Sequence, residues 1–594
     1  MLFLPARGQA EEVAIHTRSR LKRSQAQAAG PASVLAEPPD GSAGEVRHRW
    51  AALMVLCLGI FMIFLDTTIV NVAIPRIIDG IHVSLDQMLW VLNAYLLTYG
   101  VLLLTSGRLG DIFGPRNLFL VGLGIFSLAS ALCGLSRDGS QLIVARLIQG
   151  LGAALLTPQP LVIISRIFPA DRRGLALGIF AAMGGLAAMA GPPVGGLIVS
   201  TWEWPWIFYL NVPVGIAAIL LTLFLVPAIR SVGSRHLDGF GVVLASGALL
   251  TILFGLVEGE RFAWGAVYGP VTIGEVIGAG VLLLAAFFFW ERRQAEPLLP
   301  LPLFANRNFV IMAALSGVMA FALFGMLLVI TIDLQSVLSM SALQAGLTAS
   351  PLTISTTLVS PLAGRLVDRI GAKPILIFGF TLAAAGVVEL AIAESATSTS
   401  FTFVLPATMM GVGMGFVFAP LITEALREVG PDKVGPAAGL LTTTRQVGSA
   451  VGTAVVGAVL QNRLAAALHE RAVEVSSRLP YDVRREFVDA ATAPARSGLQ
   501  VGPAQVRAPI PPGVLSHVPG IEQLLRGVFA DAYVAAMRPS LALPAVALLG
   551  GALACLWIRR RGQLETIAVK PRPAGPVFEG GGLPQGSVGQ DSTS

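Results

Sequence analysis

The chain has 594 residues, of which 54% are hydrophobic and 13% charged, and its mean hydropathy is +0.74. Soluble domains carry roughly 25% charged residues, so this composition excludes a soluble protein. The net charge is +6, but the basic residues are spread over many short loops. That spread excludes a nucleic-acid interface and suits the anionic headgroups of a lipid bilayer.

The residue types give no sign of metal, nucleotide or covalent chemistry. The three cysteines all fall inside apolar runs, and the six histidines lie outside them without HxxxH or HExxH spacing. No GxxxxGK[ST] phosphate loop is present, and nothing resembles a nucleophilic triad. We therefore expect no metal, no cofactor and no enzymatic activity.

Fourteen apolar runs follow a polar start, and each is long enough to cross the ~30 Å of hydrocarbon in a bilayer. They cover 50–74, 88–106, 117–135, 141–165, 174–200, 206–227, 240–258, 271–290, 309–333, 343–363, 374–394, 401–424, 437–461 and 540–558. The short loops on one side hold fifteen basic residues, and those on the other side hold three. This bias predicts a multi-pass protein of the cell (inner) membrane with both termini in the cytoplasm.

One loop pattern occurs twice, as GRLGDIFGPR from Gly107 and as GRLVDRIGAK from Gly364. The copies lie 257 residues, or eight helices, apart, which predicts two six-helix halves with two extra helices between them. The charged side chains of the loops could lock one conformation across the cytoplasmic face, or the loops could be solvated turns. The expected conformational residues are Gly107, Asp111, Arg116, Gly364, Asp368, Arg369 and Lys373.

The predicted fold is an all-α membrane protein in five parts. A disordered cytoplasmic tail covers 1–49, the six-helix halves cover 50–227 and 309–560, the extra pair lies within 228–308, and a second tail covers 561–594. A long outer loop covers 462–539. Apolar residues at helical spacing in Ile521–Met537 predict an amphipathic helix on the outer surface, or else a solvated loop with short helices.

Two charged residues inside apolar runs are the candidate functional groups. Asp66 lies in the first run and Arg146 in the fourth. Desolvation favours the protonated form of a carboxyl group, so Asp66 could bind and release a proton. Arg146 cannot neutralise itself and needs a partner. Pairing of the two could couple proton binding to a conformational change, or it could be a structural clamp only.

Other polar residues in or beside the runs are expected to line a substrate cavity. Some extend the polar faces next to Asp66 and Arg146 by one helical turn, and others give a second polar site in a late run. Asp333 lines an outer vestibule or only marks a helix end. These cavity candidates are Thr67, Asn71, Gln149, Asp333, Arg445 and Gln446.

The fifth run carries three glycines around two adjacent prolines. Glycines allow close helix contact, and prolines remove backbone donors, so this segment predicts a bend in a tightly packed helix. The motif consists of Gly191, Pro192, Pro193, Val194, Gly195 and Gly196.

Together these motifs resemble the major facilitator superfamily, and within it the fourteen-helix drug:proton antiporters of the EmrB/QacA type. The resemblance covers roughly residues 50–560 and rests on five motifs in order. They are LDTTIVNVAIP from Leu65, the loop from Gly107, Arg146 with Gln149-Gly150, the segment from Gly191, and WIFYLNVPVG from Trp206. Asp333 departs from the group, which often has an aromatic residue at that position.

The resemblance implies an exporter that works by alternating access, with inward proton flow driving a lipophilic small molecule or drug outward. Its partners would be protons, the substrate and the bilayer, together with a periplasmic adaptor and an outer-membrane channel if the cell has an outer membrane. One alternative is a dedicated exporter of a lipid, siderophore or secondary metabolite. Another is a transport-dead sensor or scaffold on the same fold.

Overall fold

The computed structural model describes residues 48–229, 236–259, 261–294, 296–396, 398–430, 433–496 and 520–559. Clustering separates Met1–Arg49 from Trp50–Ser594, and the description below concerns the second unit. The tails expected at 1–49 and 561–594 lie outside the described residues, apart from His48 and Arg49.

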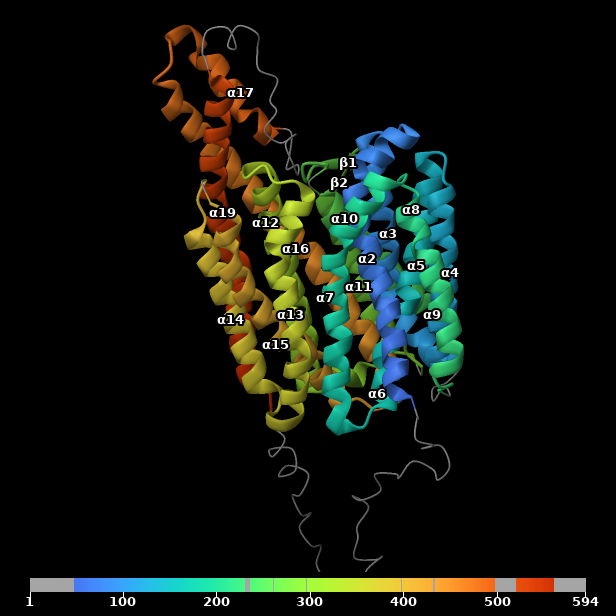
Figure 1. The fold of residues 1–594 in the computed structure, drawn as a ribbon. Coiled ribbons are helices and arrows are strands. Elements are labelled where there is room, and N and C mark those ends of the chain that lie inside the picture. The colour runs from blue at the N-terminus through green and yellow to red at the C-terminus, as the bar shows by residue number, and fades with distance from the viewer. Residues whose placement is uncertain are drawn as a thin grey trace, which may run out of the picture. The chain divides into compact units, whose positions relative to one another are not determined.

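The first half of the bundle contains the helices that carry most of the sequence motifs (Figure 1). They are α2 (Arg49–Ile81), α3 (Leu85–Phe113), α4 (Pro115–Leu135), α5 (Gly139–Leu156), α6 (Gln159–Ile167), α7 (Ala170–Thr201), α8 (Trp206–Tyr209) and α9 (Asn211–Leu225). The inserted pair comprises α10 (Gly239–Glu258), a short hairpin of β1 (Ala266–Tyr268) and β2 (Val271–Thr272), and α11 (Ile273–Glu291).

The second half repeats the arrangement, with longer helices near its end. It contains α12 (Arg307–Ile332), α13 (Ala342–Ile370), α14 (Ala372–Ala393), α15 (Val404–Arg427), α16 (Val434–Ser476), α17 (Arg484–Arg496) and α19 (Ile521–Ala554). Single turns fill the links, namely η1 (Leu301–Ala305), η2 (Asp333–Val337), η3 (Ser400–Phe403), η4 (Tyr481–Val483) and η6 (Cys555–Trp557).

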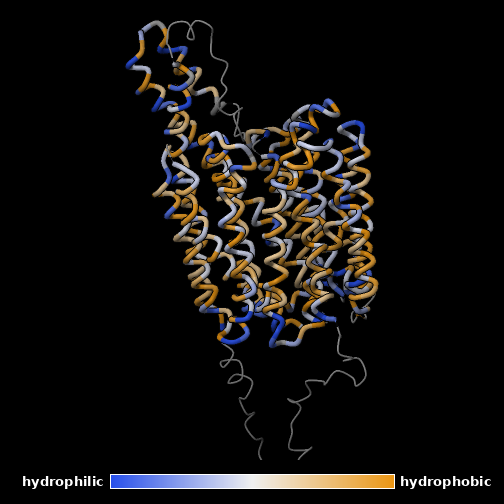
Figure 2. Tube along the Cα trace, in the orientation of Figure 1, coloured by the Kyte–Doolittle hydropathy of each residue, from blue (hydrophilic) through white to orange (hydrophobic). Residues whose placement is uncertain are grey.

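Within the described chain, thirteen helical segments are long and apolar enough to cross a membrane. The 29-residue α13 is more polar, but it also runs along the bundle, packed against α7 and α15. Figure 2 shows hydrophobic residues along the body of the bundle and hydrophilic residues gathered toward its ends. The helices coincide with the fourteen apolar runs, so the predicted all-α membrane fold is confirmed.

Both repeated loops lie at one end of the bundle, which we call the loop end. Gly114 ends α3 with φ 88°, and Gly371 ends α13 with φ 83°. These left-handed backbone angles favour glycine, which explains why this residue recurs in the loop pattern. At the opposite end, α16, α17 and α19 extend beyond the other helices as a projecting helical hairpin (Figure 1). We call this the hairpin end, after these helices and not after the β1–β2 strands.

The two halves meet tightly at the loop end. A Cβ atom added to Gly107 of α3 would lie 2.5 Å from the Gly435 carbonyl oxygen of α16. A Cβ atom on Gly178 of α7 would lie 2.5 Å from the Ser360 carbonyl oxygen of α13. Backbones can approach this closely only where side chains are absent. The structure is therefore closed at the loop end.

The segment expected to be a long loop is largely helical where it is described. The helix expected at Ile521–Met537 is the first part of α19 and continues into the last apolar run. Its apolar side chains pack on α16 and α17, where Leu468, Phe487 and Phe529 are buried. The amphipathic face is thus covered by protein, because α16 continues far enough beyond its apolar run to receive it.

The inserted pair lies at the seam between the two halves. Leu249 and Leu253 of α10 are buried with Val101 of α3 and Ala450 of α16. The α10 carboxylate of Glu258 accepts a 2.6 Å hydrogen bond from Asn93 of α3.

The linkers of this pair also reach α3 at the loop end. The Arg108 guanidinium donates to the His236 carbonyl at 3.3 Å and lies 3.7 Å from the Glu296 carboxylate. Through these contacts Arg108, in the first copy of the loop pattern, is only 7% exposed.

Candidate functional site

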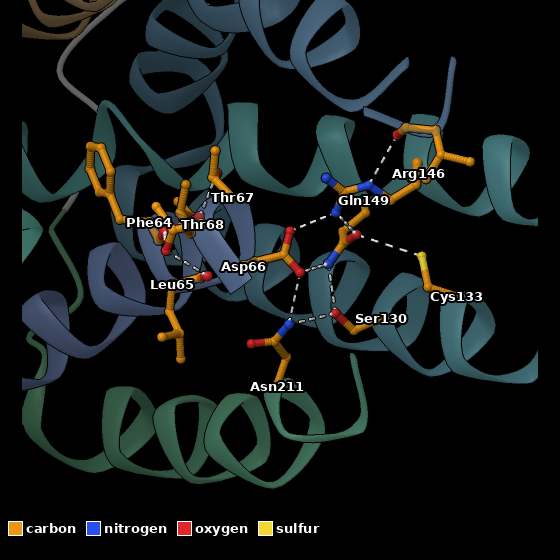
Figure 3. Close-up of polar contacts among 12 residues, drawn as sticks. Phe64, Leu65, Asp66, Thr67, Thr68, Ser130, Cys133, Arg146, Gln149 and Asn211 are labelled. Atoms are coloured by element: carbon orange, nitrogen blue, oxygen red, sulfur yellow. Dashed lines mark hydrogen bonds and ion pairs between the residues drawn. The ribbon is translucent and has the colours of Figure 1, made fainter. Parts of the chain in front are cut away.

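Asp66 is at the centre of a polar network inside the first half. The residue lies in the middle of α2, where the surrounding side chains are apolar, and its side chain is fully buried. The facing helices α5 and α9 donate hydrogen bonds to Asp66, and α4 contributes Ser130 to the same network (Figure 3). Because buried polar groups need partners, these four helices have to meet in one arrangement around the carboxylate.

The Asp66 carboxylate accepts hydrogen bonds on both oxygens. Arg146 Nη1 donates to Oδ2 at 2.6 Å, and Oδ1 accepts from Gln149 Nε2 at 2.9 Å and from Asn211 Nδ2 at 3.0 Å. The Ser130 hydroxyl oxygen accepts from the same two amides at 2.7 Å and 3.1 Å. Three donors aimed at one carboxyl group match its ionised form.

Arg146 is held from several directions as well. Its Nη1 also donates to Gln149 Oε1 at 2.6 Å, and its Nε donates to the Val91 carbonyl at 3.3 Å. The guanidinium carbon lies 4.2 Å from the centre of the Tyr95 ring, a cation–π arrangement. The side chain is 1% exposed. The ion pair is therefore shut off from solvent in this conformation.

This arrangement can respond to a proton. A proton on Asp66 would remove the negative charge that Arg146 faces and replace an acceptor with a donor. A buried guanidinium without a counter-charge is strongly unfavourable, so the network would have to open or rearrange. The stability of the buried pair therefore depends on whether Asp66 is protonated.

The structure brings together only some of the expected cavity residues. Gln149 belongs to the Asp66 network. Thr67 instead donates to the Ile63 carbonyl within α2, and Asn71 is exposed and donates to the Thr67 carbonyl. Arg445 and Gln446 are half-buried on α16, far along the chain from this network.

Asp333 takes up a separate position in the second half. It starts the turn η2 after α12 and is fully buried, in contact with the Glu394 carboxyl group.

The glycine–proline motif packs α7 against α2 beside the network. A Cβ atom on Gly195 would lie 2.8 Å from Ile69, and one on Gly191 would overlap Thr68. Gly196 faces open space. The helix continues through Pro192 and Pro193 from Ala170 to Thr201, and the expected bend stays a prediction.

The loop carboxylates reach across to the opposite half. Asp111 lies against Gly435, at the first turn of α16. Asp368 lies against Gly174 of α7 and accepts a hydrogen bond from its backbone. Each loop carboxylate therefore meets a helix of the other half rather than pointing into solvent. Only the folded bundle reveals which helix end faces each loop.

The basic loop residues have different roles. The Arg116 guanidinium donates to the Leu223 carbonyl at the end of α9. Lys373 donates to the Leu556 and Ile558 carbonyls after α19. Arg369 lines a 360 Å³ cavity at the loop end together with Arg365, Arg172 and Asp171.

Sequence reasoning missed Asn211, Ser130 and Tyr95. Asn211 could have been predicted from the sequence, because it is an amide inside the WIFYLNVPVG segment at the start of an apolar run. Ser130 and Tyr95 carried no such signal, since serine and tyrosine occur often in apolar helices.

Comparison with known proteins shows which family the chain belongs to. A family model described as "Major Facilitator Superfamily" matches residues 56–453. The chain belongs to the major facilitator superfamily. This is a family of membrane transporters rather than enzymes, so the chain is a multi-pass membrane transporter.

Several relatives in the superfamily are named as exporters or resistance proteins. The "Tetracenomycin C resistance and export protein" of Streptomyces glaucescens is 34% identical over 73% of this chain and 79% of its own length. The "Multidrug resistance protein Stp" of Mycobacterium tuberculosis is 34% identical over 72% of this chain and 79% of its own. An uncharacterised MFS-type transporter of the same species is 36% identical over 86% of this chain and 81% of its own.

Solved structures share the fold at low identity. The proton:xylose symporter XylE is 15% identical with a TM-score of 0.52, covering 70% of this chain and 90% of that one. The human organic anion transporter MFSD10 is 12% identical with a TM-score of 0.52, covering 84% and 99%. Both agree with the helical arrangement described above.

Proposed function

We propose that this transporter is a proton-coupled exporter of drugs or other lipophilic small molecules. It belongs, on this proposal, to the fourteen-helix drug:proton antiporters. It lies in the cell (inner) membrane, with the loop end in the cytoplasm together with both chain termini. Alternating access moves the substrate outward while protons move inward, and the proton gradient is the energy source in place of a cofactor.

The observation that carries the proposal is the sealed ion pair between Asp66 and Arg146. A purely structural clamp would need only one stable arrangement. Here the carboxyl group is buried and faced by three donors that suit its ionised form and that a proton would displace. The free energy of protonation is thereby tied to the packing of α2 against α4, α5 and α9, which is what coupling requires.

The closed loop end supports one half of an alternating cycle. Glycine contacts between α3 and α16, and between α7 and α13, shut that end while the Asp66 pair is intact. If the loop end is cytoplasmic, this is the state in which an exporter has released its proton inward and faces outward.

The substrate class is supported by the names of the relatives. Several are named for resistance to, or export of, antibiotics, including tetracenomycin C and puromycin. One relative in Clostridioides difficile, 30% identical, is named a riboflavin transporter. These names support drugs and other small organic compounds as substrates, and a dedicated metabolite exporter is the alternative within the same mechanism.

The test is transport by the purified full-length protein in proteoliposomes, with puromycin and tetracenomycin C as probes. Asp66→Asn keeps the shape of the side chain but cannot titrate. We expect it to abolish uphill movement of the probe on an imposed pH gradient, together with the proton flux that the probe induces. Asp79→Asn is the matched control, because Asp79 is an exposed carboxylate on the same helix.

Normal uphill transport by Asp66→Asn would disprove coupling through this carboxyl group. If the wild type moves neither probe yet exchanges an extract of cellular metabolites, the dedicated-exporter alternative is favoured. Failure of all counterflow by folded wild-type protein would favour a sensor or scaffold. An adaptor and outer-membrane partner stays a prediction, to be tested by co-purification from a cell that has an outer membrane.

A further inference from the structure

The second half contains a buried pair of carboxyl groups that the proposed mechanism does not use. Asp333, at the start of η2, is 0% exposed, and Glu394, directly after α14, is 1% exposed. The two carboxyl groups lie next to each other and interact directly, and none of their four oxygens has a hydrogen-bond donor among the described residues. Two carboxylates cannot hydrogen-bond directly unless one of them carries a proton.

The groups around the pair do not supply a counter-charge. Neither Asp333 oxygen accepts a hydrogen bond from a donor among the described residues. The neighbouring Tyr533 hydroxyl is fully buried and donates to the Val329 carbonyl at 2.7 Å instead. On α14 itself, Glu389 is a further acid. A buried carboxyl group without a cation is far more stable in its neutral form.

A cavity lies beside Glu394, among the helices that extend at the hairpin end. It has a volume of 230 Å³ and is lined by Glu394, by Arg471 of α16, and by Asp531 and Arg538 of α19. Arg471 is already paired with Glu474 at 2.9 Å, and Asp531 and Arg538 are exposed. The cavity therefore offers Glu394 a polar route to solvent without neutralising it.

We propose that Asp333 and Glu394 form a second proton-binding site, in which the two carboxyl groups share one proton that enters from the hairpin end. Asp333 holds the proton and donates it to Glu394, which leads to the cavity. When the proton leaves, two negative charges remain in contact within the protein. The site lies in the half of the bundle opposite to Asp66, and it goes beyond the proposed function, which requires only Asp66.

The titration of Glu394 agrees with this geometry. Burial raises the pKa of Glu394 from 4.5 to about 7, although the neighbouring Ser398, Asp333 and Ser395 backbone groups act in the opposite direction. The folded pair therefore keeps a proton over a pH range where the same two groups in the unfolded chain have lost theirs. The stabilisation is thus complete below about pH 4.5 and is lost as the pH rises through about 7.

The test follows thermal unfolding of the purified full-length protein in detergent by tryptophan fluorescence, from about pH 5 to about pH 8. We expect the wild-type melting temperature to fall by several degrees over this range. Asp333→Asn and Glu394→Gln each imitate the protonated state, so each should flatten the fall. Because one proton is shared, the double variant should flatten it no further than either single variant.

Asp531→Asn is the matched control, since Asp531 lines the same cavity without belonging to the pair, and it should keep the wild-type slope. The infrared band of a protonated carboxyl group, present in the wild type at neutral pH, should be lost in both single variants. Slopes that add in the double variant, or a Glu394→Gln slope equal to that of Asp531→Asn, would overturn the proposal. No transport is measured, so the result is independent of whether Asp66 couples export to protons.

Discussion

Arg116 and Lys373, which lie 257 residues apart, perform the same task in the two halves of the bundle. Arg116 donates to the Leu223 carbonyl at the end of α9, and Lys373 donates to the last carbonyls after α19. α9 and α19 are the final spanning helices of their halves. A cation at the carboxyl end of a helix satisfies free carbonyl groups and the helix dipole. The final basic residue of the repeated loop is thus a cap for a helix of its own half.

Removing one of these capping side chains should lower the unfolding free energy by a small amount. Lys373→Met keeps the length of the side chain but loses the donor, and we expect a loss of about 0.3–1 kcal/mol in unfolding free energy. Lys373→Arg should restore most of it. Denaturant unfolding in detergent measures the change, with Arg292→Met as control for an exposed arginine at the same end. Equal effects of Lys373→Met and Arg292→Met would contradict the capping role.

Asn211 should matter to the Asp66 network beyond its place in an apolar segment. Asn211→Leu removes the donor to Asp66 Oδ1 and to Ser130, leaving buried acceptors with fewer partners. We expect a loss of about 1–3 kcal/mol in unfolding free energy. Asn117→Leu is the control, because the exposed Asn117 donates only to the nearby Phe113 carbonyl at the end of α3 and should change stability by less than about 0.5 kcal/mol. If Asn211→Leu changes the unfolding free energy no more than Asn117→Leu does, then Gln149 and Arg146 alone are sufficient to stabilise the buried Asp66 carboxyl group.

Enlarging Gly364 should open the loop end. Its position faces the Gly174 backbone across the α7–α13 contact, so Gly364→Val must separate the two helices. Conformational coupling of this kind is usually worth about 1–3 kcal/mol. A cysteine placed at the buried Ser360, in a background without Cys57, Cys133 and Cys555, should then react faster with a maleimide.

Gly196→Val is the control, on the helix that Gly364 contacts but away from the contact itself. It enlarges a glycine of α7 that faces open space, so it should leave the reactivity of Ser360→Cys unchanged. Equal reactivity of all three proteins would mean that the glycine contact does not hold the loop end shut.

The orientation of the bundle is testable at residues that the structure places at opposite ends. Tyr481 is 88% exposed on the projecting hairpin, and Arg292 is exposed after α11 at the loop end. In intact cells, Tyr481→Cys should react with an impermeant thiol reagent, and Arg292→Cys should react only after permeabilisation. The reverse pattern would place the loop end outside.

Hydropathy was sufficient to locate the spanning helices, because a bilayer demands long apolar segments wherever a helix crosses. Burial of Asp66 and Arg146 was also predictable, since a charge inside such a segment needs an internal partner. The sequence could not show that α16 and α19 extend beyond the membrane segment, because their outer turns are polar on one face. Nor could it show that Asp111 meets α16, or that Asp333 meets Glu394, since both contacts depend on how helices far apart in the chain are packed.

The inserted pair is attached unequally to the two halves. Glu258 and the linkers around Arg108 form hydrogen bonds and an ion pair with α3, whereas Ala450 of α16 is met by leucine side chains. Hydrogen bonds fix direction and register, while an aliphatic surface allows sliding at little cost. If the two halves move relative to each other, α10 and α11 would therefore move with the first half, and α16 would slide along the apolar surface of α10. The inserted pair thus fills part of the seam between α3 and α16 with apolar side chains that impose no fixed register on α16.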